Sequence, residues 1–107
     1  MATAGQQQLL HVVDSASGVR YLVDSGAQVS VVPFRSTKTP HSALLAADGR
    51  KIPTWGVFTT NVVINGHRYG PHKFVRAAVD KHILGADFFC IYWTYYRYKT
   101  MQITQAF

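Results

Sequence analysis

The stretch YLVDSGAQVSVVP, residues 21–33, places one acid between two apolar segments that are rich in β-branched residues. An ionised carboxylate in an apolar interior is costly unless it finds hydrogen-bonding partners. A surface loop could hold the same group at a lower cost. The position of Asp24 therefore indicates a residue kept for chemistry. Gly26 supports this interpretation, because a glycine lets the chain turn sharply where a side chain would clash.

Length and composition predict one small domain with a packed core. The chain has 107 residues, of which 48% are hydrophobic and 15% are charged. We expect a flexible lead-in at residues 1–7 and a single domain at residues 8–107. No signal peptide and no apolar run of the ~20 residues needed to span a bilayer is evident. The one cysteine, Cys90, cannot form an internal disulfide, which fits a reducing compartment, and its apolar neighbours predict a buried packing residue.

The charge balance is basic. Eleven Lys and Arg residues oppose five Asp, which gives a net charge of +6, and there is no glutamate. A basic chain can bind nucleic acid. Here the basic residues are scattered singly, apart from Arg50 and Lys51, so we expect them on solvated strand faces. Nucleic-acid binding is therefore kept only as a secondary alternative.

The residue pattern predicts an all-β domain, a closed or nearly closed small barrel with one short C-terminal helix. Val, Ile, Thr and aromatic residues are frequent, and turn signals recur about every ten residues. Asp48-Gly49 and Asn65-Gly66 predict hairpin turns, because glycine accepts the positive φ that tight turns need. Strands are expected at 9–13, 19–23, 29–33, on both sides of Asp48-Gly49 within 42–56, and at 57–64, 73–79, 83–85 and 95–104, with the helix at 86–93.

Several chemistries are excluded. Without glutamate there is no HExxH zinc motif, and the five histidines show no metal-ligand spacing, so no metal or other cofactor is expected. His67 and His72 flank a turn and are expected to face solvent. No GxSxG elbow and no glycine-rich phosphate loop is present. Asp-Ser-Gly also surrounds some serine nucleophiles, but Val23 precedes it here, and the chain is too short for a two-barrel serine protease.

Asp24 remains as the candidate catalytic acid. Ser25 and the N–H groups of Gly26 and Ala27 could hydrogen-bond its carboxylate. Asp14-Ser15-Ala16 is an internal control, which begins with the same two residues but reads as an ordinary Asx turn. One carboxylate cannot serve as both acid and base in peptide hydrolysis, whereas two that share one proton can. A chain with one such motif would obtain the second copy from a two-fold homodimer.

Two motifs resemble those of retropepsins, the aspartic proteases of retroviruses and LTR retrotransposons. LVDSGAQVSVVP is similar to the family's catalytic signature, and HILGADFF is similar to the segment that opens its C-terminal helix. Between them, LLAADGRKIPTWG resembles the flap hairpin in the form found in gypsy-class retrotransposon proteases. The resemblance covers roughly residues 8–104. It implies a barrel-like acid-protease fold, a symmetric homodimer, and cleavage of a polypeptide substrate, a Gag-Pol-type polyprotein.

The resemblance also implies roles for individual residues. Asp24 is the catalytic acid, and Ser25 and Gly26 support its loop. The implied location is the cytoplasm, within retroelement particles, with no membrane partner. The implied substrate-binding residues are Ala27, Gln28, Val31, Ala47, Asp48, Gly49 and Ile83.

Some positions depart from the retroviral pattern. Gln28 and Ala86 stand where many retroviral enzymes have a paired aspartate and arginine, so no charge is left unpaired. The flap carries Asp48-Gly49 and Trp55 in place of several glycines. Asp87 is expected to be an ordinary acid at the start of a helix, and Trp55 a packing residue. The alternative function is a catalytically silent dimerisation or peptide-binding module, which the intact motif residues disfavour.

Overall fold

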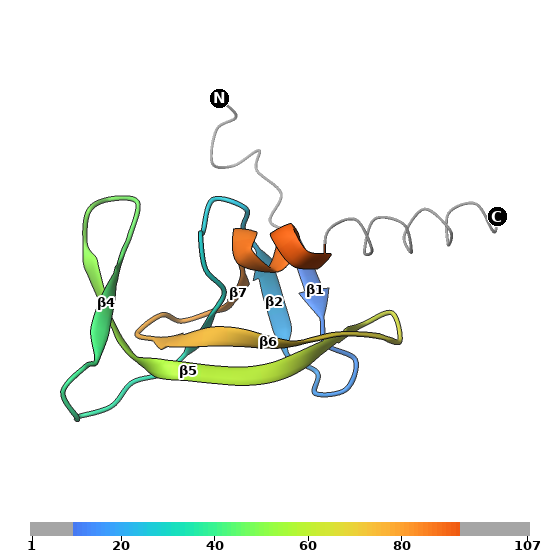
Figure 1. Ribbon diagram of the computed structural model, residues 1–107, viewed down its shortest axis with the longest axis horizontal. Coiled ribbons are helices and arrows are strands. Elements are labelled where there is room, and N and C mark those ends of the chain that lie inside the picture. Colours follow the sequence, from blue (N-terminus) through green and yellow to red (C-terminus); the bar gives the residue numbers. More distant parts are fainter. Residues whose placement is uncertain (1–9, 93–107) are drawn as a thin grey trace.

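A single curled β-sheet and one helix make up the described part of the chain, residues 10–92, in the computed structural model (Figure 1). The helix covers residues 86–92 and lies close to β1, β2 and β7. The sheet order is β1-β2-β7-β3-β6-β5-β4. The strands are β1 His11–Val13, β2 Arg20–Val23, β3 Val31–Pro33, β4 Ser42–Leu45, β5 Lys51–Ile64, β6 His67–Ala77 and β7 His82–Leu84. The all-β prediction with one short helix is confirmed.

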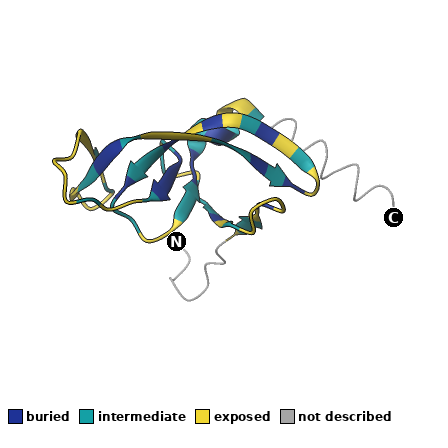
Figure 2. Cartoon of the chain, turned by 90° about the horizontal axis from the view of Figure 1, so that it is seen from below, coloured by how far each residue is buried: buried dark blue, intermediate teal, exposed yellow. Residues whose placement is uncertain are grey.

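The two longest strands, β5 and β6, form a hairpin across the molecule (Figure 1). Asn65 and Gly66 at its tip both have positive φ, 53° and 79°, as the Asn-Gly turn predicts. Irregular register between Thr54 and Val57 and between Thr60 and Val62 interrupts the ladder. Such bulges bend strands, which agrees with the curled shape of this hairpin. Both long strands carry a mixture of buried, intermediate and exposed residues along their length (Figure 2).

The short strand β7 lies between β2 and β3. It pairs in parallel with β2, with Leu22 opposite Ile83, and antiparallel with β3, with Val31 opposite Ile83. β2 and β3 are consecutive in the chain but are not neighbours in the sheet. The connecting residues 24–30 must therefore leave the sheet and return beyond β7. This path places Asp24 at the end of β2, beside the start of the helix.

The core lies between the sheet and the helix. Phe74, Leu84 and Phe88 are at most 1% exposed, and they pack with Tyr21, Tyr69 and further aliphatic residues. The Phe88 ring lies 6.0 Å from the ring of Tyr69, centroid to centroid. Burying a side chain of this size stabilises the fold by roughly 1.5–3 kcal/mol. Phe88 is therefore one of the contacts that fix the helix to the sheet.

The turn between β1 and β2 holds the β1–β2 edge against β5. Asp14 is only 4% exposed, and its Oδ1 accepts hydrogen bonds from the N–H groups of Ala16 at 3.1 Å and Val63 at 3.0 Å. Its Oδ2 accepts from the Ser17 hydroxyl at 2.7 Å, while Ser15 N–H donates to the Val63 carbonyl at 2.8 Å. The predicted Asx turn is confirmed, and the same carboxylate also closes the curl of the sheet.

Two opposing effects act on the pKa of the Asp14 carboxyl group. Desolvation alone would raise the pKa of Asp14. The hydrogen bonds from Ser17, Val63 and Ala16 stabilise the ionised form and outweigh it, so the pKa lies below its ordinary value. The turn is therefore held by an ionised group at neutral pH.

Three sequence predictions need correction. His72 is 6% exposed and does not face solvent, because β6 begins at His67 and places His72 on the same face as Phe74. Cys90 is exposed, because a residue two positions after Phe88 falls on the far side of a helix. The strand predicted at 57–64 is the second half of one continuous strand, β5. Residues 1–7 and the strand predicted at 95–104 lie outside the described residues.

Candidate active site

Asp24 follows β2 and is held from both directions. Its N–H donates to the Leu84 carbonyl at 3.0 Å, which continues the β2–β7 pairing by one residue. Its Oδ1 accepts from the Gly26 N–H at 3.0 Å. A Cβ on residue 26 would lie 3.2 Å from this oxygen, a close approach that glycine avoids. The carboxylate is thus oriented by the backbone of its own loop, while remaining partly exposed.

The rest of the loop is held by the start of the helix. Ala27 N–H donates to the Asp24 carbonyl at 3.1 Å, which closes the turn. Ala86 N–H donates to the Ala27 carbonyl at 2.7 Å and Asp87 N–H to the Gln28 carbonyl at 3.2 Å. These backbone contacts join the loop to the helix at Gln28 and Ala86 without any charged side chain at either position.

Gly85 makes this close approach possible. A Cβ there would lie 2.6 Å from the Val29 carbonyl oxygen and 2.7 Å from that of Ala27. Both neighbours are backbone atoms, so they cannot move aside as a flexible side chain could. The glycine before the helix is therefore needed for packing against the Asp24 loop.

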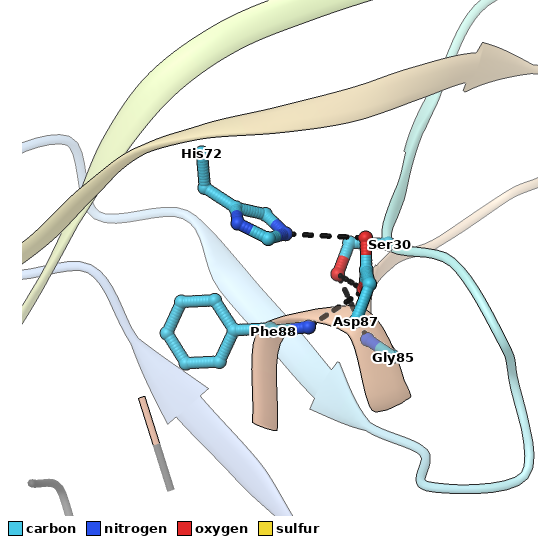
Figure 3. Close-up of polar contacts among 5 residues, drawn as sticks. All are labelled: Ser30, His72, Gly85, Asp87 and Phe88. Atoms are coloured by element: carbon cyan, nitrogen blue, oxygen red, sulfur yellow. Dashed lines mark hydrogen bonds and ion pairs between the residues drawn. The ribbon is translucent and has the colours of Figure 1, made fainter. Parts of the chain in front are cut away.

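A buried polar network lies beside this contact (Figure 3). Ser30, which is 0% exposed, accepts from the Gly85 N–H at 2.9 Å and donates to Asp87 Oδ1 at 2.7 Å. The Phe88 N–H also donates to Asp87 Oδ1, at 2.8 Å. His72 Nε2 lies 3.2 Å from Asp87 Oδ2 and donates to it, because a carboxylate can only accept. Asp87 therefore does more than begin a helix, since it connects β6, the Asp24 loop and the helix.

Asp24 opens onto a cleft of about 610 Å³. One side is formed by the Asp24 loop and by Val31 and Ile83 from β3 and β7. The other side is formed by the β4–β5 hairpin. This arrangement, a carboxylate on a fixed loop facing a hairpin across the cleft, is suited to acid–base chemistry on an extended ligand. The lining residues from the hairpin are Leu44, Leu45, Ala46, Ala47 and Ile52.

Comparison with solved structures identifies the architecture. The protease of the retrovirus EIAV, solved in complex with the inhibitor HBY-793, superposes with a TM-score of 0.58 over 83% of this chain and 90% of its own. The chain has a retroviral-protease fold. The two sequences are 18% identical, so the likeness concerns the fold. No protein-family model and no curated protein matches the sequence.

Within this retroviral-protease fold, most of the predicted site residues come together. Asp24, Gly26, Ala27, Gln28, Val31, Ala47 and Ile83 all line the cleft. Ser25 is exposed in the loop and is not part of the lining, and Asp48 and Gly49 occupy the exposed hairpin turn next to Ala47.

The sequence interpretation missed several lining residues. Val29 and Val79 line the cleft, together with the hairpin residues Leu44, Leu45, Ala46 and Ile52. The continuous apolar run from Ala43 to Ala47 was the available signal. It did not reveal which face would turn toward Asp24.

The turn of the β4–β5 hairpin contains an ion pair between Asp48 and Arg50. Asp48 Oδ2 accepts from Arg50 Nε at 2.8 Å, and Asp48 Oδ1 accepts from the Arg50 N–H at 3.0 Å. These bonds lower the pKa of Asp48. Gly49, with φ of 88°, completes the predicted turn. The pair is exposed, so it orders the turn locally.

Residues 10–92 contain no group of three or more His, Cys, Asp or Glu residues arranged to hold a metal ion. No helix in this part of the chain is long and apolar enough to cross a membrane.

Proposed function

We propose that the chain is an aspartic endopeptidase that works as a symmetric homodimer, with Asp24 of each subunit at the two-fold axis. The observation that carries the proposal is the position of Asp24, whose carboxylate is oriented by the Gly26 N–H in the lining of the cleft. The retroviral-protease fold supports it, since the similar solved structure is a protease bound to an inhibitor. Each subunit supplies one such loop, and general acid–base hydrolysis requires a pair.

The chemistry of the pair follows from a single shared proton. Two carboxyl groups in contact cannot both ionise. The ionised Asp24 removes a proton from a water molecule, whose oxygen adds to the scissile carbonyl carbon. The protonated Asp24 donates its proton to the carbonyl oxygen. The resulting tetrahedral intermediate breaks at its C–N bond. The Asp24 that took the proton from water gives it to the departing amine nitrogen. The other Asp24 takes back a proton from a hydroxyl of the intermediate, which leaves a free carboxylic acid product and restores the shared proton.

The proposed roles of the neighbouring residues follow from their positions. Ser25 and Gly26 support the loop, and Ala27, Gln28, Val31 and Ile83 contact the substrate. Ala47, with Asp48 and Gly49 beside it, would close over the bound peptide. The proposed substrate is a Gag-Pol-type polyprotein of a gypsy-class retroelement, processed within cytoplasmic particles.

A cleavage assay tests this function. The chain is incubated with a peptide library at several pH values, with and without a pepstatin-type inhibitor, and its mass is measured by sedimentation. We expect cleavage that is inhibited by pepstatin, and a specific activity that rises with protein concentration as dimers form. Asp24→Asn should lower kcat by about 10²–10⁴-fold or more.

Asp80→Asn is the matched control, because Asp80 is exposed on the surface and, within residues 10–92, its side chain pairs with Arg35 alone, at 3.5 Å. It should leave cleavage unchanged. Equal activity in Asp24→Asn, or full activity in a monomer, would refute the mechanism. Peptide binding without cleavage by the unaltered chain would instead support the catalytically silent module.

A further inference from the structure

A second cavity, of about 550 Å³, shares no lining residue with the Asp24 cleft. Its walls include Val32 of β3 and His82 of β7, whereas the adjacent residues Val31 and Ile83 line the cleft. Successive residues of a strand point to opposite faces of a sheet. The two cavities therefore lie on opposite faces of β3 and β7, and a ligand in one does not occupy the other.

The cavity contains a cation that lies over two aromatic rings. The Arg76 guanidinium carbon lies 5.4 Å from the ring centroid of Phe34 and 5.9 Å from that of Phe58. All three side chains line the cavity. Among residues 10–92, no carboxylate forms an ion pair with Arg76. A guanidinium is always charged and is fixed here by its aromatic neighbours, so it is an oriented donor with free hydrogen-bonding capacity.

Asp14, the one acid that lines the cavity, does not accept a hydrogen bond from the Arg76 guanidinium. Asp14 faces the same cavity, but its two oxygens accept from Ala16, Ser17 and Val63. The remaining walls are mainly apolar and aromatic, including Tyr21, whose ring lies edge-on to the His82 ring at 5.5 Å between centroids. The cavity therefore combines one cationic group with an apolar, ring-lined body.

We propose that this cavity binds a small organic carboxylate with an aromatic body. Its volume lies within the roughly 300–1,000 Å³ of small-molecule sites. A single planar guanidinium matches a carboxylate in a two-bond arrangement. Phe34, Phe58 and Tyr21 would contact the aromatic body of the ligand. This proposal does not depend on the proposed peptide hydrolysis at Asp24, so either one can be correct without the other.

Binding is tested by NMR titration and calorimetry with the full chain carrying Asp24→Asn, which prevents self-cleavage. The probes are 2-naphthoate, its neutral counterpart 2-naphthamide, and inorganic phosphate, which lacks an apolar body. We expect 2-naphthoate to bind at least tenfold more tightly than 2-naphthamide, and phosphate not to bind. The shifted resonances should belong to Val32, Phe58 and Arg76, and not to Ile83.

Arg76→Met should weaken 2-naphthoate binding at least tenfold while leaving 2-naphthamide binding unchanged. Arg76→Lys keeps the charge without the planar fork and should show an intermediate loss, which keeps the test decisive if the methionine variant does not fold. Arg68→Met is the matched control, since Arg68 is an exposed arginine of the same strand outside the cavity, and it should have no effect.

Several results would overturn the proposal. These are unchanged 2-naphthoate binding in both Arg76 variants, shifts confined to the Asp24 cleft, and no binding at millimolar probe. Shifts of the same resonances on raising the protein concentration alone would show that a second copy fills the cavity, and would also overturn it.

Discussion

His72 Nε2 lies 3.2 Å from Asp87 Oδ2, and this contact joins β6 to the first turn of the helix. The backbone N–H of Asp87 holds the Gln28 carbonyl, and the N–H of Ala86 holds that of Ala27. The position of the helix start thus determines the position of the Asp24 loop. His72 does not line the cleft, and its connection to the Asp24 loop runs through Asp87.

Removing the imidazole tests this connection. His72→Phe keeps an aromatic ring in the core but leaves Asp87 Oδ2 without its donor, and we expect a loss of about 1–3 kcal/mol in the free energy of unfolding. Urea titration of His72→Phe, Asp87→Asn and the double variant measures the coupling between the two residues. We expect a coupling energy of at least about 0.5 kcal/mol. Strictly additive effects would show that the contact contributes nothing.

Gly85→Ala should be among the most damaging single changes. The added Cβ would lie 2.6–2.7 Å from two backbone oxygens of the Asp24 loop, and we expect a loss of about 3 kcal/mol or more. Gly49→Ala is the matched control, because residue 49 has open space around it but a φ of 88°. Backbone strain alone predicts a loss of about 1–2 kcal/mol there. Thermal or urea unfolding of both variants compares them, and equal losses would contradict the packing argument.

Asp14 should make stability depend on pH at the acid end. Its folded pKa lies below its ordinary value of 3.8, so the ionised group contributes full stability above that value. This contribution is lost as pH falls through the lower folded pKa. Asp14→Asn should lower stability by about 1–2 kcal/mol at pH 7 and flatten the decline below pH 3.8. Unfolding measured from pH 7 to pH 2 checks this, and parallel curves for the two proteins would contradict it.

Trp55 should hold the loop before β4 through a single hydrogen bond. Its Nε1–H donates to the Lys38 carbonyl at 2.9 Å, and its ring lies 5.8 Å from that of Phe34. Trp55→Phe removes the donor and keeps an aromatic ring, so we expect a loss of about 1 kcal/mol. Hydrogen exchange across residues 34–41 should accelerate. Unchanged exchange in that loop would show that the Trp55 hydrogen bond does not hold it.

Local features of the fold were predictable from the sequence. Asn65-Gly66 and Asp48-Gly49 specify their turns through φ, which depends on the residues themselves. The start of the helix after Gly85 was also predicted. Trp55 was expected to pack, and it is 8% exposed.

Features set by long-range pairing were not predictable. The sequence predicts a strand that begins only at Lys73, after the turn at Asn65-Gly66, and a His72 that faces water. In the structure β6 begins at His67, which brings His72 to Asp87. The position of β7 between β2 and β3 likewise has no local signal. The curl of the sheet brings Leu44 and Val79 to the cleft, and this curl also has no local signal in the sequence.

The parallel pairing of β2 with β7 has a consequence for biosynthesis. A chain emerging from the ribosome exposes Asp24 early, but its loop is held by Leu84, Ala86 and Asp87, which are made much later. Pairings between such distant segments form slowly, and only after both segments are available. The nascent polypeptide therefore cannot assemble the candidate catalytic loop until translation has passed Asp87.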